Sequence, residues 1–338
     1  MNNRIRNIFF VAGLVAIVVM CFTFDVSFAE LWASITKAGY WLVAILVLWA
    51  FLYAMNALSW RAIISGSGKE NVGFWYLYKL TITGFALNYA TPVGLLGGEP
   101  YKIMELTPHI GVQRATSSVV LFSMMHIFSH FWYWVTAIVT YLVLAAIGNL
   151  SLGPGMAIIL VLMSVFCALG IYLFVKGYEN GMVVKLCNMV SHIPGLKKWG
   201  RGFTERNADN LRKIDSQISQ LHDQGKRQFY TALALEYAGR MLQAFEIYFV
   251  LRLFDTGGDG GVITFIYAFL ILAFTSLFAN LLFFFPLQLG GREGGFAMST
   301  AQMGMTNSIG IFVSLICRVR EMFWLGVGLL LMKIGNKK

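Results

Sequence analysis

The sequence has little charge and few cysteines. Only 12% of its 338 residues are charged, 58% are hydrophobic and the mean hydropathy is +0.68, whereas a soluble domain carries about 25% charge. This composition excludes an ordinary soluble domain and indicates a polytopic membrane protein. The four cysteines have no CxxC spacing, so they predict buried small side chains and neither a disulfide framework nor a metal site.

Motifs of nucleotide and metal enzymes are also missing. The sequence contains no GxxxxGK[ST] loop and no HExxH motif, so it predicts no nucleotide site, no metal site and no cofactor. The net charge of +10 would suit nucleic acid, but the basic residues cluster between apolar segments, as the positive-inside rule predicts. We therefore expect a lipid and the membrane as partners, and no nucleic acid.

One short stretch that interrupts helices occurs twice, once in each half. In both copies a Gly-Gly pair follows a proline, and an offset of 194 residues relates Pro92 to Pro286 and Glu99 to Glu293. Proline and paired glycines break helices. Broken backbone at membrane depth is tolerated only inside protein or around a wet cavity. Two such breaks in corresponding places indicate the binding site of a transporter.

Apolar segments predict about six transmembrane helices, each near the ~20 residues that a bilayer requires. We expect them at about 8–24, 39–60, 116–147, 156–175, 229–254 and 308–332. The first resembles a signal peptide, but we expect an uncleaved span. The two apolar segments that contain the breaks, about 72–110 and 262–306, predict re-entrant hairpins.

The positions of the basic residues favour this topology. With both termini cytoplasmic and both hairpins re-entrant, 20 of the 26 Lys and Arg lie inside, two lie outside and four lie within membrane segments. The expected fold is therefore an all-α polytopic membrane protein, with one domain over 1–338 and two re-entrant hairpins. In it, residues of about 39–147 and 229–332 form an inverted-topology repeat.

The main polar segment is a basic loop at about 176–228. It contains ten Lys and Arg against five Asp and Glu, which predicts a cytoplasmic position. Apolar residues recur in it at helical spacing, namely Leu211, Ile214, Ile218 and Leu221. This pattern fits an amphipathic helix on the inner leaflet and equally a solvated linker helix.

Polar residues within the membrane segments are candidates for a binding site, because an unpaired charge at the bilayer centre costs on the order of 3 kcal/mol. The candidate substrate-binding residues are Asn88, Thr91, Glu99, Lys102, His126, His130, Glu236, Arg240, Asn280, Arg292, Glu293, Arg318 and Glu321. Half-helix N-termini after each Gly-Gly pair would attract anions, and the arginines favour a phosphate or carboxylate ligand. The alternative is that the charges only neutralise one another as structural pairs.

His126 and His130 share one helix face at i, i+4 spacing. A metal site, a polar cavity wall or proton relay, and packing histidines all fit this spacing. No matching Cys or His cluster accompanies the pair, so we expect no metal.

The doubled motif resembles a known family. The pattern of Asn88, Pro92, Gly97-Gly98-Glu99 and Lys102, with Pro286, Gly290-Gly291 and Glu293 in the second half, is similar to the membrane domain of bacterial lysylphosphatidylglycerol synthase/flippase proteins and to stand-alone flippase-like proteins. The resemblance implies a lipid flippase of the bacterial inner membrane for an aminoacyl-phospholipid, a polyprenyl-phosphate or a related envelope lipid. It does not imply aminoacylation, because the soluble transferase domain is missing from the sequence.

Two other functions stay open. One is a membrane-embedded enzyme that acts on a lipid, with Glu99, Glu293 and a histidine as acid or base. The other is a non-transporting protein that docks a cytoplasmic enzyme through the loop 176–228. We expect a transporter and no enzyme, with a homo-oligomer or a cytoplasmic partner at that loop.

Overall fold

A computed structural model describes residues 28–66, 68, 72–90, 97–180, 209, 211–212, 215–216, 226–254, 261–281 and 291–333. All regular elements in these ranges are helices. They are α2 (Phe28–Ala38), α3 (Tyr40–Gly66), α4 (Phe74–Ala90), α5 (Gly98–Ile110), α6 (Val112–Ala146), α7 (Pro154–Asn180), α11 (Lys226–Leu251), the 3-10 helix η2 (Arg252–Phe254), α12 (Val262–Leu281), α13 (Gly291–Gln302) and α14 (Asn307–Lys333). The span predicted at 8–24, residue Thr91 and most of the basic loop lie outside the described residues.

Among the described residues, four helices are long and apolar enough to cross a membrane, namely α3, α6, α7 and α12. The first three confirm the helices predicted at about 39–60, 116–147 and 156–175. The 35 residues of α6 correspond to about 52 Å, which exceeds the ~30 Å of the hydrocarbon core, so α6 is long enough to cross it with a tilt. α11 and α14 are of similar length to α3, with 26 and 27 residues, but they bury charged side chains.

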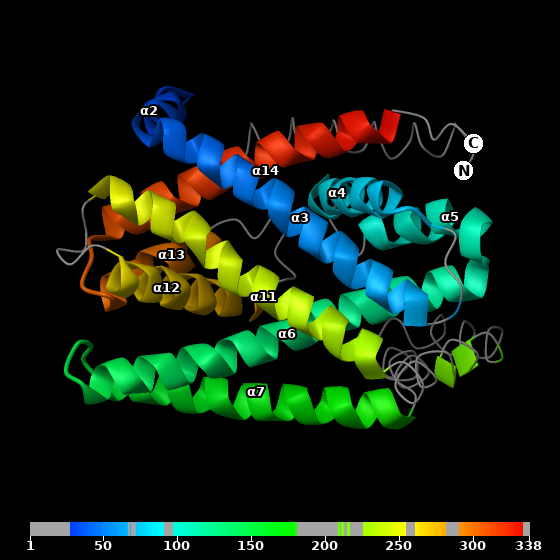
Figure 1. The fold of residues 1–338 in the computed structure, drawn as a ribbon. Coiled ribbons are helices and arrows are strands. Elements are labelled where there is room, and N and C mark those ends of the chain that lie inside the picture. The colour runs from blue at the N-terminus through cyan, green and yellow to red at the C-terminus, as the bar shows by residue number, and fades with distance from the viewer. Residues whose placement is uncertain are drawn as a thin grey trace, which may run out of the picture.

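α3 and α11 pack along each other at the centre of the molecule, and two matching series of three helices continue from them. α3 contacts α4, α4 contacts α5 and α5 contacts α6; likewise α11 contacts α12, α12 contacts α13 and α13 contacts α14. Figure 1 shows the α4–α5 pair and the α12–α13 pair at opposite ends of the central pair. The two halves therefore have the same order of packing.

In each half two helices flank the broken stretch, α4 and α5 in the first half and α12 and α13 in the second. Asn88, at the end of α4, accepts a hydrogen bond at its Oδ1 from the backbone N–H of Gly98 at 2.6 Å. α5 and α13 begin at the Gly-Gly pairs and carry Glu99 and Glu293 in their first turns. A carboxylate at this position complements the helix dipole.

Each hairpin leads into the next long helix through a glycine with positive φ. Gly111 precedes α6 with φ of 81°, and Gly304 lies between α13 and α14 with φ of 77°. Residues with a Cβ rarely adopt this conformation, so the corresponding turns of both halves depend on glycine.

Two features differ from the sequence prediction. α2 is a separate helix between the first and second predicted spans, in a segment for which no element was predicted. α12 has 20 residues, enough to cross the membrane, whereas α13 has only 12. The arms of the second hairpin are therefore unequal, and a half-crossing course of both hairpins stays a prediction.

Candidate functional site

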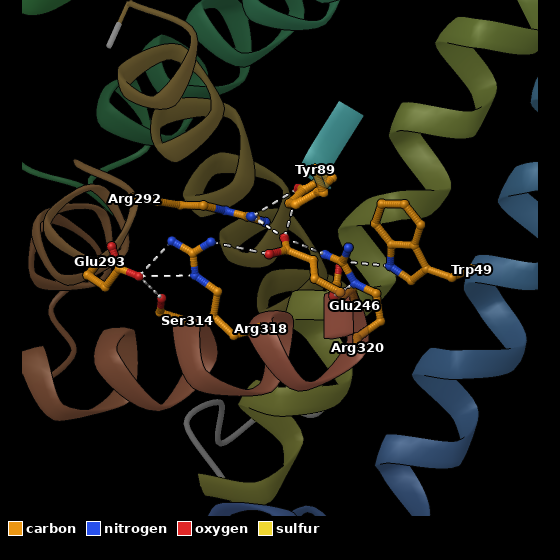
Figure 2. A network of polar contacts seen from close by, with 9 residues as sticks. Trp49, Tyr89, Glu246, Arg292, Glu293, Ser314, Arg318 and Arg320 are labelled. Atoms are coloured by element: carbon orange, nitrogen blue, oxygen red, sulfur yellow. Dashed lines mark hydrogen bonds and ion pairs between the residues drawn. The ribbon is translucent and has the colours of Figure 1, made fainter. Parts of the chain in front are cut away.

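Six buried or half-buried ions form one group where α11, α13 and α14 meet, which we call the arginine cluster. Its members are Glu246, Arg292, Glu293, Arg318, Arg320 and Glu321. Figure 2 shows the labelled members of the cluster converging from the three helices, with Trp49 of α3 and Tyr89 of α4 at the edge. The cluster holds three positive and three negative charges, so its members balance one another.

Glu321 is the centre of this cluster. Its carboxylate pairs with Arg292, and with Arg318 at 3.4 Å and Arg320 at 3.5 Å. Tyr89 donates a hydrogen bond to the same carboxylate at 3.0 Å. Because Tyr89 is the penultimate residue of α4, this contact joins the end of the first hairpin's entering helix to the second half of the molecule.

Glu293 forms the outer edge of the arginine cluster. Arg318 donates to its Oε1 from Nη2 at 3.0 Å and from Nε at 3.2 Å. The side chain of Glu293 is 33% exposed and that of Arg292 is 12% exposed. The remaining four members are almost fully buried, so Arg292 and Glu293 are the part of the cluster that a ligand can reach.

Glu246 and Arg320 form the inner end of the cluster. Arg320 Nε donates to Glu246 at 2.9 Å, and the indole N–H of Trp49 donates to the same carboxylate at 3.0 Å. The guanidinium of Arg320 also lies 3.7 Å from the centroid of the Trp49 ring, a cation–π contact. Both carboxylate oxygens are thus satisfied, as a buried ion requires.

A second polar group, the histidine cluster, lies between α6 and α11. It consists of His126, Ser129, His130, Glu236 and Arg240. His126 Nδ1 lies 2.8 Å from Glu236 Oε2. Arg240 donates to Ser129 Oγ at 2.6 Å, to His130 Nε2 at 2.7 Å and to the backbone oxygen of His126 at 2.7 Å. The two candidate histidines are therefore in one network with two charged residues of α11.

The first break contributes a smaller polar group. Lys102 is 5% exposed and its Nζ lies 3.4 Å from Glu99 Oε1. The ammonium also lies 5.3 Å from the centroid of the Phe122 ring and 5.8 Å from that of Trp60. Asn88 Nδ2 lies 3.5 Å from Glu99 Oε1, so the amide that caps α5 also contacts its first-turn carboxylate.

The predicted site residues thus fall into three groups and not into one. Glu236 and Arg240, four residues apart on α11, do not pair with each other in the way that their spacing favours; Glu236 contacts His126 instead. Asn280 donates to the backbone oxygen of Ser276 on its own helix at 2.7 Å. Within the described residues, no group of three or more His, Cys, Asp or Glu side chains could hold a metal ion.

Sequence reasoning did not select Trp49, Tyr89, Glu246 and Arg320 as site residues. Glu246 and Arg320 pair across 74 positions of the chain, and spacing along one helix carries no signal for such a contact. Their presence as charges within apolar segments was the available signal, because buried charges require partners.

The sequence matches the family described as "Lysylphosphatidylglycerol synthase TM region" over residues 9–328, nearly the whole chain. No curated protein and no solved structure matches it.

Proposed function

Because the chain belongs to the family of the lysylphosphatidylglycerol synthase transmembrane region, we propose that it moves a lipid with a polar or anionic head group between the leaflets of the bacterial inner membrane. The observation that carries this proposal is the arginine cluster, a set of arginines whose positions are fixed by ion pairs with carboxylates near the start of α13. Arginine binds phosphate through two parallel hydrogen bonds, so a lipid phosphate can replace a carboxylate partner.

The reachable edge of the cluster fits a head group with a phosphate and an amine. Arg292 would bind the phosphate, because it is the most exposed arginine of the cluster. Glu293 would bind a cationic group, since it is the most exposed carboxylate. The apolar tails would stay in lipid, and the head group would enter beside the N-terminus of α13, whose dipole also favours an anion.

The matching order of packing in the two halves supports an inverted-topology repeat, in which one half rocks against the other around the site. Tyr89 supports this interpretation, because it connects the first hairpin to Arg292 and Glu321. In this arrangement both termini and the basic loop face the cytoplasm, as the distribution of Lys and Arg favours.

Transport accounts for the cluster better than catalysis does. Each carboxylate of the cluster accepts hydrogen bonds from an arginine, which suits an exchange of partners during binding. An acid or base in catalysis instead exchanges its proton with a substrate. We therefore propose a non-enzymatic role.

The test is an assay of lipid movement between leaflets in proteoliposomes, with fluorescent phosphatidylglycerol, lysyl-phosphatidylglycerol and polyprenyl phosphate. We expect Arg292→Gln to slow phosphate lipids about tenfold or more, since a hydrogen bond to a charged group contributes about 1.5–3 kcal/mol. Glu293→Gln should slow lysyl-phosphatidylglycerol more than phosphatidylglycerol. Arg252→Gln, at an exposed arginine of η2, is the matched control and should move lipid as the wild type does. Absence of movement of any lipid by the folded wild type would refute the proposal.

A further inference from the structure

We infer that the His126–Glu236 pair is a proton-binding site through which lipid movement is coupled to a proton gradient. The inference rests on the proposed function, because it concerns the coupling ion of the same transport. It depends on a different cluster, on α6 and α11, from the one that is proposed to bind the head group.

The pair combines a reachable base with a buried acid. The side chain of His126 is 40% exposed and that of Glu236 is 1% exposed, at 2.8 Å between Nδ1 and Oε2. Glu236 Oε1 is buried and has no hydrogen-bond partner within the described residues. A buried carboxylate with an unused acceptor is costly, so a positive charge beside it is favoured. His126 can supply that charge by taking up a proton.

The other members of the cluster are fixed in one protonation state. His130 Nε2 accepts a hydrogen bond from Arg240, so its proton must be on Nδ1, which faces the backbone oxygen of His126 at 3.1 Å. A second proton on His130 would break its bond with Arg240. Arg240 itself stays charged. His126 is therefore the imidazole that is free to change state.

The groups that act on His126 come from three helices. α11 supplies Arg240 and Glu236, and α5 supplies Lys102, which pairs with Glu99. α6 supplies His130, and its Tyr133 acts on Arg240. With neutral His126 the charges of Arg240, Glu236, Lys102 and Glu99 cancel, so one bound proton gives the group a net charge of about +1.

Proton binding needs no other change in bonding. The proton adds to Nε2 of the imidazole, while Nδ1–H continues to donate to Glu236, and the pair becomes imidazolium and carboxylate. Loss of the proton from Nε2 restores the neutral ring. A sodium ion would not replace the proton, because hard cations prefer several oxygen ligands and the carboxylate of this pair is only 1% exposed.

The added positive charge explains how the proton would affect transport. An anionic head group and a proton neutralise each other, so each should raise the affinity for the other by the same factor. Because a lipid phosphate and the proton are then carried together, they should move in the same direction across the membrane.

The first test uses the wild type and fluorescent phosphatidylglycerol in proteoliposomes, with the membrane potential clamped by valinomycin and potassium. We expect the lipid to accumulate in the leaflet that faces the more alkaline side, and to reverse when the pH gradient is reversed. A sodium gradient should have no effect. Lipid movement that does not depend on the pH gradient would overturn the inference and leave the proposed function intact. No movement under any condition would overturn both.

The second test measures protons directly. Purified protein in weak buffer with a pH indicator should take up close to one proton per chain when short-chain phosphatidylglycerol is added. His126→Gln should take up none, whereas His109→Gln, at an exposed histidine of α5, should behave as the wild type. Equal melting temperatures of the variants ensure that folded proteins are compared. Equal proton uptake by His126→Gln and the wild type would contradict the inference.

Discussion

In the arginine cluster and in the histidine cluster alike, a basic side chain of a long helix contacts a glutamate of α11. Arg320 of α14 contacts Glu246, and His126 of α6 contacts Glu236. The offset of 194 residues that relates Glu99 to Glu293 also relates His126 to Arg320. Arginine is always charged in proteins, whereas histidine changes charge near neutral pH. Corresponding positions of the two halves therefore hold one permanent and one switchable cation.

The same offset reveals a second difference, at the breaks. Gly98 corresponds to Arg292. A Cβ at Gly98 would overlap the backbone of Gly84 on α4, so the first break is closely packed. In the second half Arg292 extends from the start of α13 to Glu321 and Tyr89. At this pair of positions the first half therefore has a glycine that allows close packing of α5 on α4, and the second half has a charged side chain.

The largest effect should come from Glu321→Gln. This change leaves three buried arginines without their common partner, and loss of one member of a buried ion pair costs about 3–5 kcal/mol. We expect a large fall in the melting temperature of the purified protein, followed by tryptophan fluorescence. Glu293→Gln serves as the control within the cluster, because its partly exposed side chain can be solvated. An equal loss in both variants would show that Glu321 is not the centre of the network.

The next largest loss of stability should come from a change to the close packing of α5 on α4 at the first break. Gly98→Ala should force α5 away from α4, because the obstacle is backbone and not a flexible side chain; overpacking of this kind costs about 1–3 kcal/mol. Gly294→Ala is the matched control in the first turn of α13, where a Cβ meets no atom within 4 Å. We expect only Gly98→Ala to lower the melting temperature. A comparable drop in Gly294→Ala would remove the distinction between the two breaks.

The sequence predicted the helices better than their contacts. Hydropathy located α3, α6 and α7, and the Gly-Gly pairs located the starts of α5 and α13, because both signals are local. The partners of the buried ions could not be predicted in this way. Glu236 contacts His126 across 110 positions, although Arg240 lies only four residues from it on the same helix. The correspondence of positions 126 and 320 could not be predicted from the sequence either, because one residue is a histidine and the other an arginine.

A smaller loss of stability should distinguish a hydrogen bond to a charged acceptor from one to a neutral acceptor. The indole N–H of Trp49 donates to the Glu246 carboxylate at 3.0 Å, and that of Trp134 donates to the Ser276 hydroxyl at 2.9 Å. Trp49→Phe should lower stability by about 1.5 kcal/mol or more, and Trp134→Phe by about 1 kcal/mol or less. Unfolding curves in mixed SDS micelles measure both. The reverse order would indicate that the packing of the rings, and not the acceptor, determines the loss.

The smallest effect on stability, and the most specific effect on function, should come from His126→Arg, which gives the first half the permanent cation of the second. The side chain of His126 is 40% exposed and an arginine there keeps a positive charge beside Glu236, so we expect a smaller change in stability than in the variants above. In the wild type, movement of phosphatidylglycerol should quicken as the pH is lowered, because His126 gains its proton. In His126→Arg the rate should be independent of pH. The reciprocal change, Arg320→His, should be far more damaging, because Arg320 is fully buried and a neutral ring there would leave Glu246 without its counter-charge. If instead His126→Arg keeps the pH dependence of the wild type, the switchable charge lies elsewhere and the correspondence between the two cations is structural alone.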